Sequence, residues 1–125
     1  MRAFDAGHDV HVILRTDAAP AGGLRVEPVC TAGTEVFRAP VRRLGGTRAP
    51  RAVEVAVLRV PRGEHRFSCW EPRTKTRAHA DLKVDGERWV VMDLEPGRPQ
   101  GRLRVFDRPP HDEVGSWRPL VAVPD

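Results

Sequence analysis

The chain has 125 residues and a mass of 13.9 kDa, about the size of one ordinary domain, which leaves no room for a second unit of independent stability. Its 21 Lys and Arg against 17 Asp and Glu give a formal net charge of +4, with 40% hydrophobic residues. This composition excludes a transmembrane bundle and a collagen-like repeat, and it disfavours a fully disordered chain. Valine is the commonest aliphatic residue, and 12 prolines and 11 glycines are scattered along the whole length. Because Val favours pleated surfaces and Pro interrupts helices, we expect a β domain.

Apolar residues recur at every second position in segments bounded by turn residues, a pattern typical of strands. Two short runs, 34–38 and 41–44, are separated by Pro40 and suit one edge or bent strand. The expected strands, in chain order, cover residues 8–15, 24–29, 34–38 with 41–44, 52–60, 65–70, 78–84, 88–94 and 102–106. The sequence therefore predicts an all-β fold, a single antiparallel β-sandwich of seven to eight strands that is immunoglobulin-like or transthyretin-like, with a small β-barrel as the alternative.

The turn residues also predict how neighbouring strands pair. Segment 52–60 is apolar on both faces, which favours a central position in a sheet. The turn Pro61-Arg62-Gly63-Glu64 predicts that 65–70 is its hairpin partner, and Asp85-Gly86 is the strongest two-residue hairpin signal in the chain. We expect one domain over residues 1–125, with a Pro-rich tail, about 107–125, packed on it through Trp117 and its neighbours.

Part of the chain resembles a known kind of module. The run Val55–Ser68 contains Gly63, His65 and Phe67, and it is followed by the alternating segments 80–84 and 90–94. Over residues 52–94 this is similar to the repeating half of PEGA-type and carboxypeptidase-regulatory-like modules, in which a Gly-x-His turn follows a hydrophobic strand. These modules are small transthyretin-like or immunoglobulin-like sandwiches. The resemblance implies a non-catalytic, extracytoplasmic bacterial module used for adhesion or scaffolding.

The two cysteines bear on the compartment. Cys30 and Cys69 lie 39 residues apart, which excludes a Cys-x-x-Cys motif. They form either a disulfide, worth about 3–4 kcal/mol in the chain-entropy model, or a pair of buried free thiols. No apolar stretch is long enough to span a bilayer, and residues 1–8 lack the core of a secretory signal. We expect a periplasmic or extracellular protein that begins after a removed leader; the alternative is a cytoplasmic one.

A basic segment is the strongest candidate for binding. No acidic residue lies between Glu35 and Glu54, whereas this span carries Arg38, Arg42, Arg43, Arg48 and Arg51. Five clustered guanidinium groups predict contact with an anionic polymer such as nucleic acid, with lipid headgroups or with an acidic partner, and an affinity that falls with salt. The alternative is an ordinary solvated loop. A second group is diluted by Asp107 and consists of Arg98, Arg102, Arg104 and Arg108.

Metal and catalytic candidates are weaker. On a strand, Asp9 and His11 share a face about 7 Å apart while His8 points to the opposite face. A third metal ligand would have to come from His65, His79 or His111; the alternative is a polar strand end. Cys69 is interpreted either as a thiolate paired with His65 or His79, or as a residue of the core or of a disulfide. A further hypothesis is a pair of facing carboxylates, Asp81 and Asp93. Three tryptophans form either a carbohydrate platform or protein interface, if they are exposed, or the closed ends of the core; they are Trp70, Trp89 and Trp117.

The sequence contains no nucleophile elbow and no phosphate-binding loop. We therefore expect a non-catalytic protein without metal or cofactor. The predicted function is protein binding or scaffolding in an exported bacterial protein or assembly, with another protein or subunit as the partner. The alternative is binding of an anionic polymer or acidic partner through the Arg-rich segment 38–51.

Overall fold

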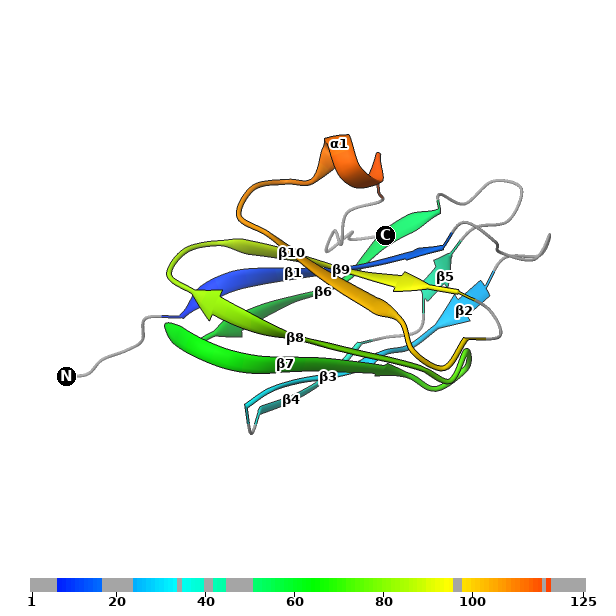
Figure 1. Cartoon of the computed structure of the whole chain (residues 1–125), viewed down its shortest axis with the longest axis horizontal. Coiled ribbons are helices and arrows are strands. Elements are labelled where there is room, and N and C mark those ends of the chain that lie inside the picture. The colour runs from blue at the N-terminus through cyan, green and yellow to red at the C-terminus, as the bar shows by residue number, and fades with distance from the viewer. Residues whose placement is uncertain are drawn as a thin grey trace, which may run out of the picture.

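The computed structural model describes residues 7–16, 24–33, 35–39, 42–44, 51–95, 98–115 and 117, with side chains except at 35 and 42–44. These residues form ten strands and one short helix (Figure 1). The elements are β1 (His8–Thr16), β2 (Leu24–Val26), β3 (Val29–Ala32), β4 (Glu35–Arg38), β5 (Arg42–Leu44), β6 (Ala52–Val60), β7 (Gly63–Glu71), β8 (Thr76–Val84), β9 (Arg88–Leu94), β10 (Arg102–Phe106) and α1 (His111–Val114).

The strands form two four-stranded sheets and one two-stranded pair. The first sheet has the order β10-β9-β1-β6, the second sheet has the order β4-β3-β7-β8, and β2 pairs with β5. The prediction of an all-β fold is confirmed. The ladders are antiparallel except between β1 and β9, which run parallel in a register that begins at Val10 and Arg88. The described residues hold ten strands against the seven to eight predicted, because two expected strands each divide. The segment 24–29 divides at Pro28, which has no N–H for a ladder, and the two runs on either side of Pro40 form β4 and β5 in different sheets, not one strand.

The inner faces of the two four-stranded sheets contribute to one hydrophobic core. Figure 1 shows the first sheet lying above the second, with α1 on the far side of the first sheet. Fully buried core side chains come from both sheets, Val12 and Met92 from the first and Phe67 and Leu82 from the second. Within the described residues no ladder joins one four-stranded sheet to the other. The facing edges are linked by an isolated bridge between Arg77 and Gln100, which does not close a barrel. The barrel alternative therefore has no support.

The predicted central position of segment 52–60 is wrong. Strand β6 pairs with β1 and lies at an edge of the first sheet. The register of the two strands shifts where Val12 faces Ala56 but Ile13 faces Glu54, so that Val55 is an extra, bulged residue. The bulge moves Val57, which the alternation placed with Val55, to the outside at 39% exposure. Both faces read as apolar because the bulge changes which residues point inward.

Both predicted hairpins around β7 and β8 are also wrong. Strand β6 lies in the first sheet and β7 in the second, and β8 and β9 are likewise in different sheets. The tight hairpin turn predicted at Asp85-Gly86 needs a positive φ, and Gly86 does not have one. The true hairpins of the second sheet join β7 to β8 through residues 72–75, where Lys75 has φ 56°, and β3 to β4 through Gly33, with φ 63°.

The described part of the Pro-rich tail contacts the outer face of the first sheet. Val114 and Trp117 pack against a small buried cluster of Ile13, Ala52 and Val91. Helix α1 lies in this segment, directly after Pro110. Residues 118–125 lie outside the described residues.

Candidate functional site

Two edge strands, one from each sheet, lie side by side and form the most distinctive feature of the surface. Strand β8 ends the second sheet and β10 ends the first. At one end the backbone joins them, because the Arg77 N–H donates to the Pro99 carbonyl at 2.8 Å and the Gly101 N–H donates to the Arg77 carbonyl at 2.8 Å. Beyond Arg77, no described residue forms a backbone hydrogen bond to this side of β8.

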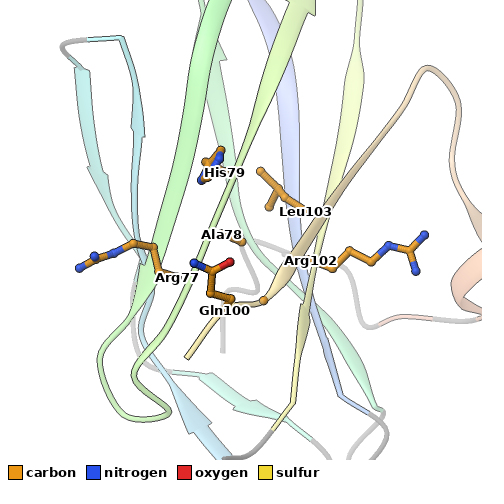
Figure 2. Close-up of a pocket in the computed structure, with 7 residues that line it drawn as sticks. Arg77, Ala78, His79, Gln100, Arg102 and Leu103 are labelled. Carbon is orange, nitrogen blue, oxygen red and sulfur yellow. The ribbon is translucent and has the colours of Figure 1, made fainter. Parts of the chain in front are cut away.

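A hollow of about 390 Å³ opens between the two edges, lined by Arg77, Ala78, His79, Gln100, Gly101, Arg102 and Leu103. Figure 2 shows the side chains of Gln100 and Leu103 directed into the space beside Ala78. The guanidinium groups of Arg77 and Arg102 extend to opposite sides, away from the hollow. The hollow is therefore lined by polar and apolar groups alike, and Ala78 and Leu103 give an apolar side chain a surface to pack on.

The backbone of β8 presents an unpaired edge. In an antiparallel ladder, the N–H and C=O groups of a residue point to the same side, and the side alternates along the strand. Since both groups of Arg77 point away from β7, those of His79, Asp81 and Lys83 point away as well. Three residues thus offer donors and acceptors in the spacing that an added strand requires.

The outward side chains of β8 carry alternating charge. Asp81 stands directly opposite Arg66 of β7, and Lys83 stands opposite Glu64. His79 is opposite the uncharged Ser68. All of the outward residues on β8 are exposed, so an added strand would meet a defined pattern of charge.

Close packing around Gly101 fixes one end of the hollow between β8 and β10. A Cβ atom on Gly101 would lie 2.7 Å from Thr76 Cγ2 and 2.9 Å from the Asp93 carbonyl oxygen, so glycine is required for β8 and β9 to approach here. Just before β8, the fully buried Glu71 carboxylate accepts hydrogen bonds from two backbone N–H groups, those of Glu27 and Thr74, both at 2.7 Å. The sequence does not reveal the role of Glu71 or Gly101, because nothing local distinguishes them from solvated loop residues.

The structure describes the side chains of two arginines of the predicted basic segment, and these two lie at different sheets. Arg38 is exposed at the end of β4 in the second sheet, whereas Arg51 is exposed just before β6 of the first sheet. The backbones of Arg42 and Arg43 lie on β5, which pairs with β2. The side chains of Arg42 and Arg43, and the whole of Arg48, lie outside the described residues. In the second basic group, Arg98 pairs with Glu95 at 3.2 Å, while Arg102 and Arg108 are exposed.

The predicted metal candidates have other partners. Asp9 accepts from Arg59 at 3.3 Å, and His11 lies between two carboxylates, with Nδ1 2.8 Å from Glu54 and Nε2 2.5 Å from Glu87. Burial lowers the pKa of His11, but the hydrogen bonds and charges of the two carboxylates outweigh it, so that the net pKa is raised above the ordinary value. The described residues contain no group of three or more His, Cys, Asp and Glu able to hold a metal ion.

A disulfide joins Cys30 and Cys69, which face each other on β3 and β7 with their Cα atoms 4.1 Å apart. Of the two alternatives, the structure has the bridged one, and the described residues include no free cysteine for a thiolate pair with His65 or His79. The hypothesis of facing carboxylates is wrong, because Asp81 and Asp93 lie in different sheets.

Asp93 instead accepts from Arg104 at 2.9 Å and from Arg15 at 3.4 Å. The three tryptophans also separate. Trp89 and Trp117 pack beside the buried cluster on the outer face of the first sheet. Trp70 is partly exposed on the outer face of the second sheet, where the Arg77 guanidinium lies 5.0 Å from its ring centroid.

Comparisons with protein-family models, with curated proteins and with solved structures find no match to this chain. The resemblance to PEGA-type modules therefore stays a prediction. Among the described residues, no helix has the length and apolar character needed to cross a membrane.

Proposed function

We propose that this chain is a β-sandwich module of an exported bacterial protein and that it binds another protein by accepting an extended segment along the free edge of β8. The observation that carries the proposal is the unpaired backbone of His79, Asp81 and Lys83 beside a hollow that Ala78 and Leu103 line in part. In strand addition of this kind, backbone hydrogen bonds supply affinity, and pockets for alternate side chains supply specificity. Both elements lie next to each other here.

The charge pattern indicates the partner. A second copy paired antiparallel about its own centre would place Asp81 opposite Asp81, and like charges directly opposite destabilise a ladder. A different protein removes this penalty when it carries an acidic residue opposite Lys83 and none opposite Asp81. Its alternate residues would point inward beside Ala78 and Ala80 and would need to be apolar. The expected occupant is therefore a strand with apolar residues at every second position and, between them, an acidic residue that faces Lys83 but none that faces Asp81.

The compartment and the absence of catalysis are part of the same proposal. Structural disulfides persist in oxidising compartments, so the Cys30–Cys69 bridge supports an exported protein. The two four-stranded sheets with a shared core support a sandwich. The resemblance over residues 52–94 implies an adhesive or scaffolding role, which fits a module that offers a sheet edge.

A library of displayed decapeptides tests the proposal. Selection on the oxidised protein should enrich sequences with apolar residues at every second position and an acidic residue at the position that faces Lys83. Lys83→Glu should weaken a selected peptide about tenfold, and a peptide with the opposing acid changed to Lys should recover it. His79→Pro removes an outward N–H and should abolish binding, whereas His79→Ala, the matched control, keeps the backbone donor.

Three results would overturn the proposal. The first is that selection enriches no extended peptide. The second is that a selected peptide still binds His79→Pro while the thermal unfolding of this variant matches that of His79→Ala. The third is a dimer in sedimentation that dissociates on His79→Pro, because the occupant of the β8 edge would then be a second copy.

A further inference from the structure

Two rows of side chains cross the outer face of the second sheet, which presents its four strands side by side. From β4 to β8, one row runs Arg38, Val29, Trp70 and Arg77, and the next runs Val36, Thr31, Ser68 and His79. Arg38, Arg77 and His79 are exposed, and Val36 is 56% exposed. The described part of the tail packs on the first sheet, and no described residue of the tail covers these rows.

Arg38 and Arg77 make the first of these rows positively charged, and neither row carries an acidic residue. The acidic residues of this face, Glu64 and Asp81, lie on other rows, where they stand opposite Lys83 and Arg66. Among the described residues neither Arg38 nor Arg77 has an ion-pair partner. The guanidinium of Arg77 lies over Trp70 instead. The rows therefore combine an aromatic ring with cations whose charge no carboxylate neutralises.

The spacing sets what such a ligand must be. Strands in a sheet lie about 4.8 Å apart, so the stems of Arg38 and Arg77, three strands apart, are separated by about 14 Å. A matching ligand carries anionic groups on an extended chain, with a ring between them that can lie on Trp70. Guanidinium groups bind carboxylates in bidentate fashion, and an indole face packs on the apolar face of a ring.

Two polymers fit this description in outline, an acidic polysaccharide and a single-stranded nucleic acid. Nucleic-acid grooves stack successive bases on several aromatic side chains, whereas Trp70 is the single aromatic residue in these two rows. The Cys30–Cys69 disulfide lies directly beneath, between the strands that carry Thr31 and Trp70, and it indicates an oxidising compartment. Both observations favour the polysaccharide.

We propose that Arg38, Trp70, Arg77 and His79 form a binding site for an acidic polysaccharide on the outer face of the second sheet. The two arginines hold carboxylate groups of different sugar units. When the Arg77 guanidinium turns from the Trp70 ring to a carboxylate, the indole is uncovered and carries the pyranose ring between them. Three of these residues, Trp70, Arg77 and His79, come from outside the Arg-rich segment 38–51. This site uses side-chain faces, whereas the proposed protein-binding site uses the backbone edge of β8, so each stands without the other.

Oligogalacturonate is the probe, with neutral dextran of similar length as the control polymer. Calorimetric titration should show binding to oligogalacturonate that weakens steeply between about 10 and 150 mM salt, and no binding to dextran. The double variant Arg38→Gln/Arg77→Gln should weaken binding at least tenfold, and Trp70→Leu by a similar factor.

Two control variants give the test its contrast. Arg66→Gln removes a cation from the same face, but one that stands opposite Asp81, and should change the affinity less than twofold. Lys83→Glu, which should impair peptide binding at the β8 edge, should likewise retain oligogalacturonate binding. Thermal unfolding of each variant confirms that the fold is intact.

Three results would overturn the proposal. The first is that oligogalacturonate does not bind at low salt. The second is that its binding survives Arg38→Gln/Arg77→Gln and falls instead with Arg66→Gln. A thymidine dodecamer that binds more tightly than oligogalacturonate, and depends on Trp70, would assign the same face to nucleic acid.

Discussion

Removal of the Cys30–Cys69 disulfide should strongly destabilise the fold. The bridge crosses two adjacent strands of the second sheet and joins residues 39 apart in the chain. In the chain-entropy model, a cross-link stabilises the native state by restricting the unfolded chain, and the effect grows with the logarithm of the loop length. For a loop of this length it amounts to about 4 kcal/mol, a large share of the stability of a small domain.

Equilibrium unfolding in urea, with and without a reductant, measures this contribution. The reduced protein should lose about 4 kcal/mol in unfolding free energy, and its midpoint temperature should fall by about 15 °C, given the unfolding entropy of a chain of this size. The double variant Cys30→Ala/Cys69→Ala is the control, because reductant should leave it unchanged. Its additional loss relative to the reduced protein reports the packing of two side chains that are 4% and 1% exposed.

The reasoning fails if oxidised and reduced protein unfold within about 1 kcal/mol of each other. It also fails if the mass of the oxidised protein is not two hydrogens below that of the reduced protein. In the second case the cysteines are free, and the argument for an oxidising compartment, on which the choice of polysaccharide over nucleic acid partly rests, is lost as well.

Three substitutions test other contacts. His11→Gln should flatten the pH dependence of the unfolding free energy. The raised pKa of His11 in the folded state adds stability that is complete below the unfolded pKa and is lost as pH rises through the folded pKa. Urea titrations at pH values on both sides of these two pKa values measure the dependence, and a variant with the wild-type slope contradicts the argument. Glu71→Gln should cost about 2 kcal/mol in urea unfolding, because an amide has one acceptor oxygen where two backbone N–H groups bond separate oxygens; a neutral result refutes this. Gly101→Ala should lower the melting temperature and weaken peptide binding, because the added Cβ would lie 2.9 Å from the Asp93 carbonyl oxygen; wild-type values would refute the close approach.

The existence of most strands could be predicted from alternation alone. Residues 78–84 alternate strictly, and the structure has β8 there, with Ala78, Leu82 and Val84 buried. Alternation reports which residues share a face, and that is a local property of an extended chain. It does not report which strand lies beside which, so the expected partners of 52–60 and 78–84 were wrong although the strands themselves were right.

Pairing failed for a physical reason. Turn residues predict a hairpin when the chain folds straight back, but the links after β6 and β8 cross from one sheet to the other. The same residues, Pro61 with Gly63 and Asp85 with Gly86, suit either kind of link. Burial of both inner faces in one core decides between them, and that energy depends on contacts far apart in sequence.

Both proposed sites follow from these long-range contacts. Arg77 is unremarkable in the sequence, yet the β7–β8 ladder sets it opposite Trp70, and β3 and β4 then bring Arg38 into the same row. The acid-free segment drew attention to Arg38 for a different reason, its neighbours along the chain, most of which lie on other sheets or outside the described residues. In a β protein a binding face is assembled across strands, so a cluster of charge in the sequence identifies a site only when its members share one strand face. Of the two arginines of this segment whose side chains the structure describes, Arg38 lies in such a row, and its partners come from β7 and β8.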